Sequence, residues 1–444
     1  MTAEAARLPP GWRWATVGNL SERVSVGYVS STRPFFCPPG EGVPLVRSQN
    51  IRPGRLVLDD VAWVTRAFHA ANVKSQLRPG DVLFTRVGAN VGDVCIVPEG
   101  IGDMHLSSAV FARPQPAHRK YIELFFRSPL GQNLLKSRIV GSVSERINTR
   151  DVEAVSVLLP PPAEEAAIVG ILGPTDHKIE LARTTNETLE SIARAIFKSW
   201  FVDFDPVNAK AEARDPGLPP HLADLFPDSF EDSEFGQVPT GWQVGRFGAV
   251  VAQHRGQENP LLSPDALFHH FSIPAFDEGQ SPRPEYGESI KSVKWRVPAG
   301  VILLSKLNPE IERVWMVDVD PGDRAICSTE FLVLRALPPY TRTYAYCLAR
   351  SPLFRQQIEG LVTGTSKSHQ RAPVESILNL TVVIPPSPIV AAFAQFADPM
   401  LERTLACRRE SRALTALRDA LLPKLISGEV SARGVQRWPV ETSR

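Results

Sequence analysis

The sequence of 444 residues lacks a strong net charge and any long apolar run. Its 49 lysines and arginines almost balance its 48 aspartates and glutamates, so the formal charge is +1. A protein that binds nucleic acid unaided usually relies on a basic surface, so such a role would need local patches or a basic partner. The sequence contains no run of about 18 apolar residues, so no transmembrane helix is predicted. Its N-terminus also has no apolar signal core. We expect a cytoplasmic protein.

Cysteine is also scarce, and the sequence has no cysteine pair at C-x-x-C spacing. The odd number and wide separation of the cysteines favour reduced thiols over a disulfide framework. The histidines His254, His269 and His270 have no cysteine or acidic residues at metal-ligand spacing, so no metal site is predicted. The five cysteines are Cys37, Cys95, Cys327, Cys347 and Cys407.

Motifs of nucleotide-dependent enzymes are missing as well. No G-x-x-x-x-G-K-[ST] segment occurs, which argues against ATP-driven DNA translocation by this chain. Adenine methylation needs a glycine-rich loop for S-adenosylmethionine and an Asn/Asp-Pro-Pro-aromatic motif. Asn308-Pro309 is followed by glutamate and Asp205-Pro206 by valine, so neither segment is that motif.

What the sequence does contain is a long internal repeat. "LPPGWRWATVGNL" from Leu8 is matched by "VPTGWQVGRFGAV" from Val238, and "GDVLFTR" from Gly80 by "GVILLSK" from Gly300. "YIELFFRSPL" from Tyr121 is matched by "YAYCLARSPL" from Tyr344, and "VSVLLPPP" by "LTVVIPPS", in the same order along the chain. Many ordered landmarks at a nearly constant offset predict a duplicated domain.

Each repeat starts with short β-type runs separated by proline and glycine turns, and a helical stretch follows. After a proline cluster, apolar residues recur at alternating spacings of four and three, which is typical of a coiled-coil seam. The first seam contains Ile168, Leu172, Thr175, Ile179, Ala182, Asn186, Leu189, Ala193, Ile196 and Trp200. The second, noisier seam contains Phe393, Ala397, Met400, Thr404, Cys407, Ser411, Leu414, Arg418, Leu421 and Leu425.

Two further features of the seams bear on their structure. Pro174 and Pro399 share a repeat position, and proline lacks the N–H that a helix interior needs, so we expect a break or kink and a helix starting near each. Residues 163–200 hold six acids and four bases, and residues 388–428 hold six bases and four acids. Opposite net charges favour packing of the two helices on each other. Asn186 and Ser411 would form a polar layer between them. The alternative is that each helix packs only on its own globular domain.

Five stretches resemble the DNA-specificity subunit of type I restriction–modification systems. The most specific are "WFVDFDPVNAK" from Trp200 and "FPDSFEDSEFGQVPTGW" from Phe226. The others are the opening stretch from Leu8, "VVIPPSPIVAAF" from Val382 and "ALRDALLPKLISGEV" from Ala416. The resemblance covers essentially the whole chain in the family's order. One departure is "AEEAAI" after the first proline cluster, where the family commonly has Glu-Gln.

The resemblance implies an α+β fold: two similar α/β target recognition domains separated by two long antiparallel, coiled-coil-like helices, with pseudo-twofold duplication. Each domain would read one half of a bipartite double-stranded DNA site, and the helices would set the gap and dock two modification (adenine methyltransferase) subunits. The expected parts are an N-terminal recognition domain (1–160), a central spacer helix (161–210), a linker (211–237), a C-terminal recognition domain (238–385), a distal spacer helix (386–430) and a tail (431–444).

The same resemblance implies a non-catalytic subunit of a phage-defence complex that binds no cofactor itself. S-adenosylmethionine would belong to the modification subunits. ATP and magnesium would belong to restriction or translocase subunits where these are present. No membrane partner is expected.

Polar segments that follow strand-like runs are the candidate DNA contacts, because glutamine and asparagine suit adenine and cations suit phosphates. The first repeat offers Arg47, Ser48, Gln49, Asn50 and Arg86 and, after Gly141, Ser142, Ser144, Arg146, Asn148 and Arg150. The second offers Lys306 and, after Gly364, Thr365, Ser366, Lys367, Ser368, His369, Gln370 and Arg371. The alternatives are a strand-end turn for the segment from Arg47, solvated loops for the glycine-led segments, and simple surface cations for Arg86 and Lys306.

Two other classes of function stay open at this point. One is a methyltransferase or nuclease in its own right, which binding of S-adenosylmethionine to the isolated chain would reveal. The other is a duplicated protein-interaction scaffold that never touches DNA, which the near-zero net charge supports. A gel shift with random duplex, with and without a modification subunit, would separate the scaffold from the specificity subunit.

Overall fold

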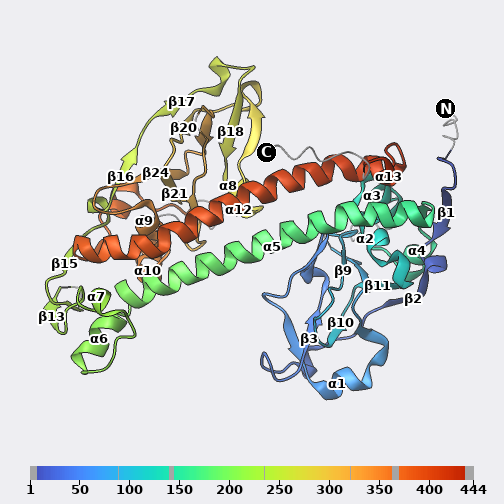
Figure 1. The fold of residues 1–444 in the computed structure, drawn as a ribbon, viewed down its shortest axis with the longest axis horizontal. Coiled ribbons are helices and arrows are strands. Elements are labelled where there is room, and N and C mark those ends of the chain that lie inside the picture. The colour runs from blue at the N-terminus through green and yellow to red at the C-terminus, as the bar shows by residue number, and fades with distance from the viewer. Residues whose placement is uncertain are drawn as a thin grey trace. The chain divides into compact units, whose positions relative to one another are not determined.

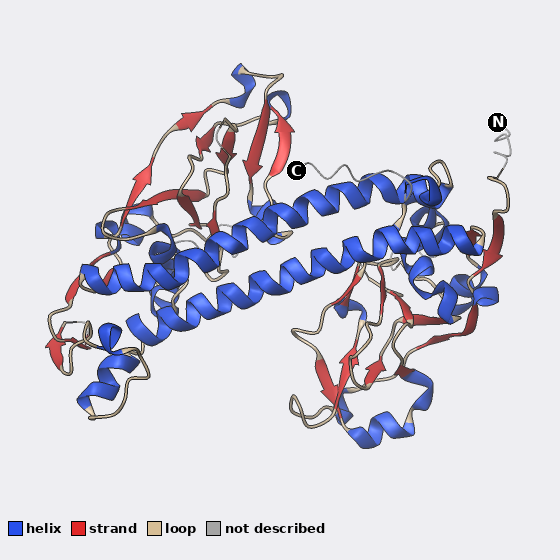
Figure 2. Ribbon diagram, in the orientation of Figure 1, coloured by secondary structure: helices blue, strands red, loops and turns tan. Residues whose placement is uncertain are grey.

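The computed structural model describes residues 8–88, 90–139, 145–234, 236–320, 322–362 and 370–435. It divides into two compact units, each of which contains the strand-rich part of one sequence repeat (Figures 1 and 2). Unit 1 comprises Met1–Glu180 with Ala413–Arg444, and unit 2 comprises Leu181–Arg412. Each unit therefore also holds one part of each of two long helices.

Unit 1 contains two four-stranded sheets and two short strand pairs. The first sheet is antiparallel, and the second contains one parallel pair, β3 with β10. In order, the first sheet is β2 (Ser21–Val26), β11 (Val110–Pro114), β8 (Val82–Phe84) and β9 (Val94–Ile96). The second is β6 (Ala62–Val64), β3 (Val43–Val46), β10 (Met104–Leu106) and β7 (Gln76–Leu77). The short pairs are β1 (Arg13–Thr16) with β12 (Ser156–Leu159), and β4 (Ile51–Arg52) with β5 (Arg55–Leu56).

Unit 2 repeats the topology of both sheets. Its antiparallel sheet is β16 (Val251–His254), β24 (Phe331–Ala336), β21 (Val301–Ser305) and β22 (Val314–Met316). Its mixed sheet is β19 (Arg283–Tyr286), β18 (Leu267–Phe271), β23 (Ala325–Cys327), β20 (Lys294–Arg296) and an added β17 (Gln257–Glu258), with β18 and β23 parallel. The short pairs are β15 (Gln243–Arg246) with β25 (Thr381–Ile384), and β13 (Phe230–Ser233) with β14 (Gly236–Pro239). The predicted α+β fold and its duplication are confirmed.

The shorter helices lie between strands along the chain, except α13, which follows α12. In unit 1 they are α1 (Arg66–Ala71), α2 (Arg119–Arg127), α3 (Pro129–Lys136), α4 (Thr149–Ala154) and α13 (Ala432–Val435). In unit 2 they are α6 (Asp205–Ala211), α7 (Pro220–Ala223), α8 (Ile273–Asp277), α9 (Arg342–Ala349), α10 (Pro352–Glu359) and α11 (Val374–Leu378). The helix α6 and the β13–β14 hairpin occupy much of the stretch after the first long helix.

The repeated Gly-Trp opening is a turn that lies against the end of a long helix in each unit. Gly11 and Gly241 have φ angles of +80° and +79°, which favour glycine. The following tryptophans donate their backbone N–H to Pro9 and Pro239, both at 3.0 Å. A Cβ on Gly428, just beyond the second long helix, would lie 3.1 Å from Trp12, and Trp242 packs on Phe201 at the end of the first. The two openings thus have the same structural role.

The two long helices are α5 (Pro162–Phe201, 40 residues) and α12 (Ser387–Ser427, 41 residues). The prediction that they start near Pro174 and Pro399 is wrong, because both prolines lie inside the helices. Proline removes one backbone donor but leaves the rest of the ladder. The Thr175 hydroxyl donates to the Ile171 carbonyl at 3.0 Å, next to the proline. The buried Ile168 and Leu172 hold the preceding turns in the core of unit 1.

Within each unit, α5 and α12 pack on each other in antiparallel fashion. In unit 1 the start of α5 meets the end of α12, where Leu172 shares a core with Leu425. In unit 2 the end of α5 meets the start of α12, where the rings of Trp200 and Phe393 are 6.3 Å apart. All seam positions named above are buried or half-buried. These helices also pack on the globular part of each unit, but the prediction that they pack on each other is confirmed and the alternative of packing only on a globular domain is wrong.

One acid on α5 joins three elements of unit 1. Asp176 accepts hydrogen bonds from Arg127 of α2 at 2.6 and 3.1 Å and from Lys120 of α2 at 2.9 Å, and lies 3.4 Å from Arg418 of α12. Burial by itself would raise the pKa of Asp176, but the hydrogen bond from Arg127 and the two cations on α2 lower it to about 2. The carboxylate therefore stays charged and ties α2 and α12 to α5.

A second acid on α5 has the same role in unit 2. Glu190 accepts from Arg350 at 2.7 Å, just beyond α9, and from the Tyr346 hydroxyl of α9 at 3.1 Å, and it pairs with Arg408 of α12. Burial would raise the pKa of Glu190, but the charges of Arg408 and Arg350 outweigh it and lower the pKa. Arg127 and Arg350 are the arginines of the two Arg-Ser-Pro-Leu segments, so this identical motif anchors each repeat to α5.

Candidate nucleic-acid interface

In both units the structure brings together two of the predicted contact segments. The backbone N–H of Ile147 donates to the Arg86 carbonyl at 3.0 Å, and that of Ala372 donates to the Lys306 carbonyl at 3.0 Å. Isolated bridges join Val87 to Arg146 and Leu307 to Arg371. The paired segments are far apart in sequence, and the equivalent positions meet in each repeat. We call this pairing the shared surface: residues 86–87 with 146–147, and residues 306–307 with 371–372.

The first copy of the shared surface is rich in cations. Arg146 and Arg150 are exposed, and Arg86 is half-buried. Burial raises the pKa of the nearby Asp93, and the positive charges of Arg52 and Lys136 oppose that shift. Arg52 and Lys136 therefore lie close enough to the hairpin between β8 and β9 to act on Asp93.

The second copy has the same backbone pairing, and there an acid lies beside the equivalent arginine. Arg371 is exposed and pairs with Glu330 through two bonds of 3.0 and 2.9 Å. Gln370 is half-buried, and its carbonyl accepts from the Asn308 N–H at 2.9 Å. Lys306 is half-buried as well. The two repeats thus present different side chains on one frame.

The prediction that Asn50, in the segment from Arg47 to Asn50, contacts DNA is wrong. Asn50 is only 3% exposed, its amide donates to the Val57 carbonyl at 3.0 Å, and its side-chain oxygen accepts from the Arg47 N–H at 2.9 Å. Residues Ser48–Asn50 form a 3-10 turn at the end of β3. A buried amide whose groups are used internally cannot reach a base, so Asn50 is a turn residue. Gln49 is exposed, whereas Arg47 and Ser48 are half-buried.

Asn148 is also used within the fold. It caps α4, and its side-chain N–H₂ donates to Asp151 at 2.9 Å. A cap of this kind stabilises the helix start, so Asn148 has a structural role whether or not it meets DNA. The other predicted contacts lie outside the described residues: Ser142, Ser144, Thr365, Ser366, Lys367, Ser368 and His369.

The buried acids that follow the first proline cluster explain the departure in "AEEAAI". Glu165 accepts from His118 at 2.7 Å, and burial raises the pKa of Glu165 although His118 opposes the shift. Glu164 accepts from the Ser431 hydroxyl at 3.1 Å and from the backbone N–H of Ala432. Both acids lie in the first turn of α5, where negative charge is favourable. They serve to join α5 to its neighbours.

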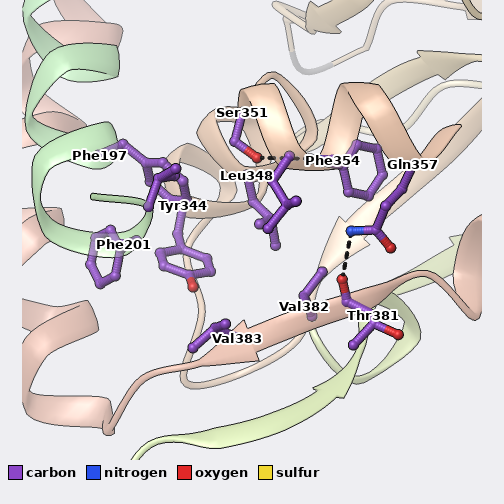
Figure 3. Close-up of a pocket in the computed structure, with 12 residues that line it drawn as sticks. Phe197, Phe201, Tyr344, Leu348, Ser351, Phe354, Gln357, Thr381, Val382 and Val383 are labelled. Atoms are coloured by element: carbon purple, nitrogen blue, oxygen red, sulfur yellow. Dashed lines mark hydrogen bonds between the residues drawn. The ribbon is translucent and has the colours of Figure 1, made fainter. Parts of the chain in front are cut away.

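The described residues line cavities of very different size, and one in unit 1, beside Gly80, His118 and Glu165, has a volume of about 910 Å³. The one in Figure 3 has a volume of about 20 Å³ and is lined by the end of α5, by α9, by α10 and by β25. Phe197, Phe201 and Tyr344 face it, and Gln357 closes one side by donating to the Thr381 carbonyl at 3.0 Å (Figure 3). This space is about the size of one water molecule. It is a packing gap beneath the aromatic end of α5.

Two other classes of site are absent from the described residues. No group of three or more histidine, cysteine, aspartate or glutamate side chains there could hold a metal ion. No helix in the same part of the chain is long and apolar enough to cross a membrane.

Comparison with known proteins gives a consistent result. No family model matches the chain. The specificity subunit of type I restriction enzyme HindI from Haemophilus influenzae is 24% identical over 94% of this chain and 99% of its own length. That of MjaIX from Methanocaldococcus jannaschii is 24% identical over 70% of this chain and 69% of its own. The crystal structure of the type I S subunit from M. genitalium has the same fold, with a TM-score of 0.58, 12% identity, and coverage of 93% of this chain and 96% of that one.

The architecture defines a duplicated two-domain protein built on a pair of long antiparallel helices. The similarity to named subunits runs through both repeats and both helices. The chain is thus similar in sequence to the specificity subunits of type I restriction–modification systems, and its fold is that of a type I S subunit.

Proposed function

We propose that this chain is the non-catalytic, DNA-reading subunit of a type I complex, and that each repeat reads one half of a bipartite site. The observation that carries the proposal is the shared surface, which has the same backbone pairing in both repeats and different side chains on it. A common frame with variable side chains is what two recognition modules for two different sequences need. Each good bidentate base contact would contribute about 1–3 kcal/mol.

Linking two such modules makes the second contact intramolecular, so two half-sites that each bind weakly are together bound with high affinity. The long helices support this role, because each is continuous from residues of one unit into residues of the other. We further propose that the helices set the gap between half-sites and dock two modification subunits, and that the domain boundaries are those expected above. The modification subunits would supply S-adenosylmethionine chemistry and most of the positive charge.

Arg146→Ala tests base reading by the shared surface. Arg146 is exposed and its backbone is bridged to Val87, so the substitution should leave folding unchanged and remove a donor from the groove. We expect affinity of the complex for the cognate duplex to fall by about 5- to 150-fold, with relaxed preference at one or two positions of one half-site. The measurement is a gel shift with a panel of duplexes, each altered in one half-site.

The matched control is Arg214→Ala, because Arg214 is an exposed arginine paired with Glu212 outside both repeats. It should leave affinity within about twofold, since surface substitutions rarely exceed ~0.5 kcal/mol. If Arg146→Ala instead weakened binding to every duplex equally and flattened the salt dependence, Arg146 would contact phosphate. If it had no effect on either, the first copy of the shared surface would not face DNA.

A further inference from the structure

The tip of the hairpin between β8 and β9 has the same construction as the tip between β21 and β22. In the first, the N–H of Val91 donates to the Gly88 carbonyl at 3.1 Å. In the second, the N–H of Ile311 donates to the Asn308 carbonyl at 2.9 Å. Both donors, like both acceptors, occupy equivalent positions of the two repeats. Gly88 and Asn308 both have positive φ, +103° and +46°. Each repeat therefore ends this hairpin in a tight turn that starts from a left-handed residue.

In each repeat, the hairpin tip accepts a hydrogen bond from a side chain of the helix that starts at the proline of the Arg-Ser-Pro-Leu segment. Gln132 of α3 donates to the Gly92 carbonyl at 2.9 Å and to the Phe126 carbonyl at 2.6 Å. Arg355, at the equivalent position of α10, donates to the Pro309 carbonyl. Arg355 is 9% exposed, and burial lowers its pKa against the opposing charges of nearby glutamates. These hydrogen bonds fix the position of each turn relative to α3 or α10.

Each tip also contacts the shared surface through its backbone. The residues that lead into the turns, Val87 and Leu307, are the ones bridged to Arg146 and Arg371. Asn308, the first residue of the second turn, also donates its N–H to the Gln370 carbonyl at 2.9 Å. In each repeat the tip therefore adjoins the described end of the predicted contact segment, at Arg146 in one and at residues 370–371 in the other.

The third position of each turn carries an exposed polar side chain, Asn90 in the first repeat and Glu310 in the second. Resting on the proposed function, we propose that these are specificity-determining residues: Asn90 reads an adenine in one half-site, and Glu310 reads a cytosine in the other. Asparagine can bond the N6 and N7 atoms of adenine, and glutamate can accept from the N4 amino group of cytosine.

Charge makes the assignment sharpest for Glu310. A carboxylate near DNA is repelled by the phosphates, and a hydrogen bond accepted from a base offsets that repulsion. Asn90 carries no charge, so it would contribute geometry and not general affinity. The two residues occupy one backbone position and differ in the base they suit, which would make the two half-sites different.

The test uses the full chain in complex with its modification subunit, in wild-type form and with Asn90→Ala or Glu310→Ala. The readouts are the methylated motif and the affinity for duplexes altered at single positions. We expect each variant to accept other bases at one position of one half-site, in place of adenine in one case and of cytosine in the other. The affinity for the cognate duplex should fall by about 5- to 150-fold. Glu310→Gln should also lose the preference for cytosine, because the amide is a weaker acceptor.

Matched controls are Asn133→Ala on α3 and Glu288→Ala, which are exposed residues of the same types in the same repeats. Both should keep the wild-type motif and affinity. Unchanged motifs in the Asn90 and Glu310 variants, with wild-type reading a split site, would overturn this inference and leave the proposed function intact. Stronger binding of Glu310→Ala to all duplexes would overturn it too, as that is relief of repulsion alone. A wild-type complex without any sequence preference would overturn both.

Discussion

Replacing Glu190 with alanine is expected to lower the free energy of unfolding of unit 2 by about 3–5 kcal/mol. The carboxylate is 14% exposed and accepts from Tyr346 and Arg350 while pairing with Arg408. Its removal takes their common partner from Arg350, 12% exposed, which keeps Glu312 at 2.6 Å, and from Arg408, 17% exposed. An unpaired buried charge costs far more than the pair contributes. Denaturation in urea, followed by tryptophan fluorescence, measures the loss.

Glu187→Ala is the control for this experiment. Glu187 lies on the same helix, is 57% exposed and pairs with Arg183 at i,i+4 spacing. Exposed pairs of this kind contribute about 0.3–0.5 kcal/mol, so the control should change stability little. A loss below about 1 kcal/mol for Glu190→Ala would contradict the view that Glu190 joins α9 and α12 to α5.

The second large effect concerns the long helices. Seven residues inserted after Glu180 of α5 and seven after Arg412 of α12 would lengthen both helices where the two units divide. Seven residues are two turns, so the seam keeps its register. The gap between half-sites should grow by about 10 Å, or about three base pairs, and methylation at the original spacing should disappear. Both half-site sequences should stay the same.

Sequencing of methylated adenines in cells that carry the lengthened protein measures this spacing. The control is the same insertion in the exposed loop around residues 212–219, which follows α6 and belongs to neither long helix. That variant should keep the original gap. Methylation at the original spacing by the lengthened protein would mean that something other than the helices sets the distance.

Much of the fold follows from the repeat in the sequence. Landmarks such as the Gly-Trp turns and the Arg-Ser-Pro-Leu segments lie at positions where the backbone or a charge pair admits few substitutes, so they survive in both copies. Gly11 needs its positive φ, and Arg127 and Arg350 have carboxylates to bind. The seam spacing located the long helices because a buried stripe must repeat at helical period.

The predictions that were wrong, and the contacts that were missed, also have physical causes at particular residues. Pro174 did not mark a helix start, since tertiary packing of the flanking turns outweighs one missing hydrogen bond. Asn50 looked like a base reader because its type suits adenine, but the turn after β3 uses its amide internally. The contact between Arg86 and Ile147 could not be read from the chain, because pairing between distant segments leaves no local pattern. The hairpin tips were missed for the same reason.

The central claim is that each repeat reads its own half of the site. The most direct test replaces residues 9–161 with the equivalent segment of another family member that keeps the arginine equivalent to Arg127. This range retains the β1–β12 ladder and the contact of Gly11 with Pro161. The account predicts that sequencing of methylated adenines finds one half-site changed to that of the donor, with the other half-site and the gap unchanged. A change in both half-sites together, or in neither, would contradict it.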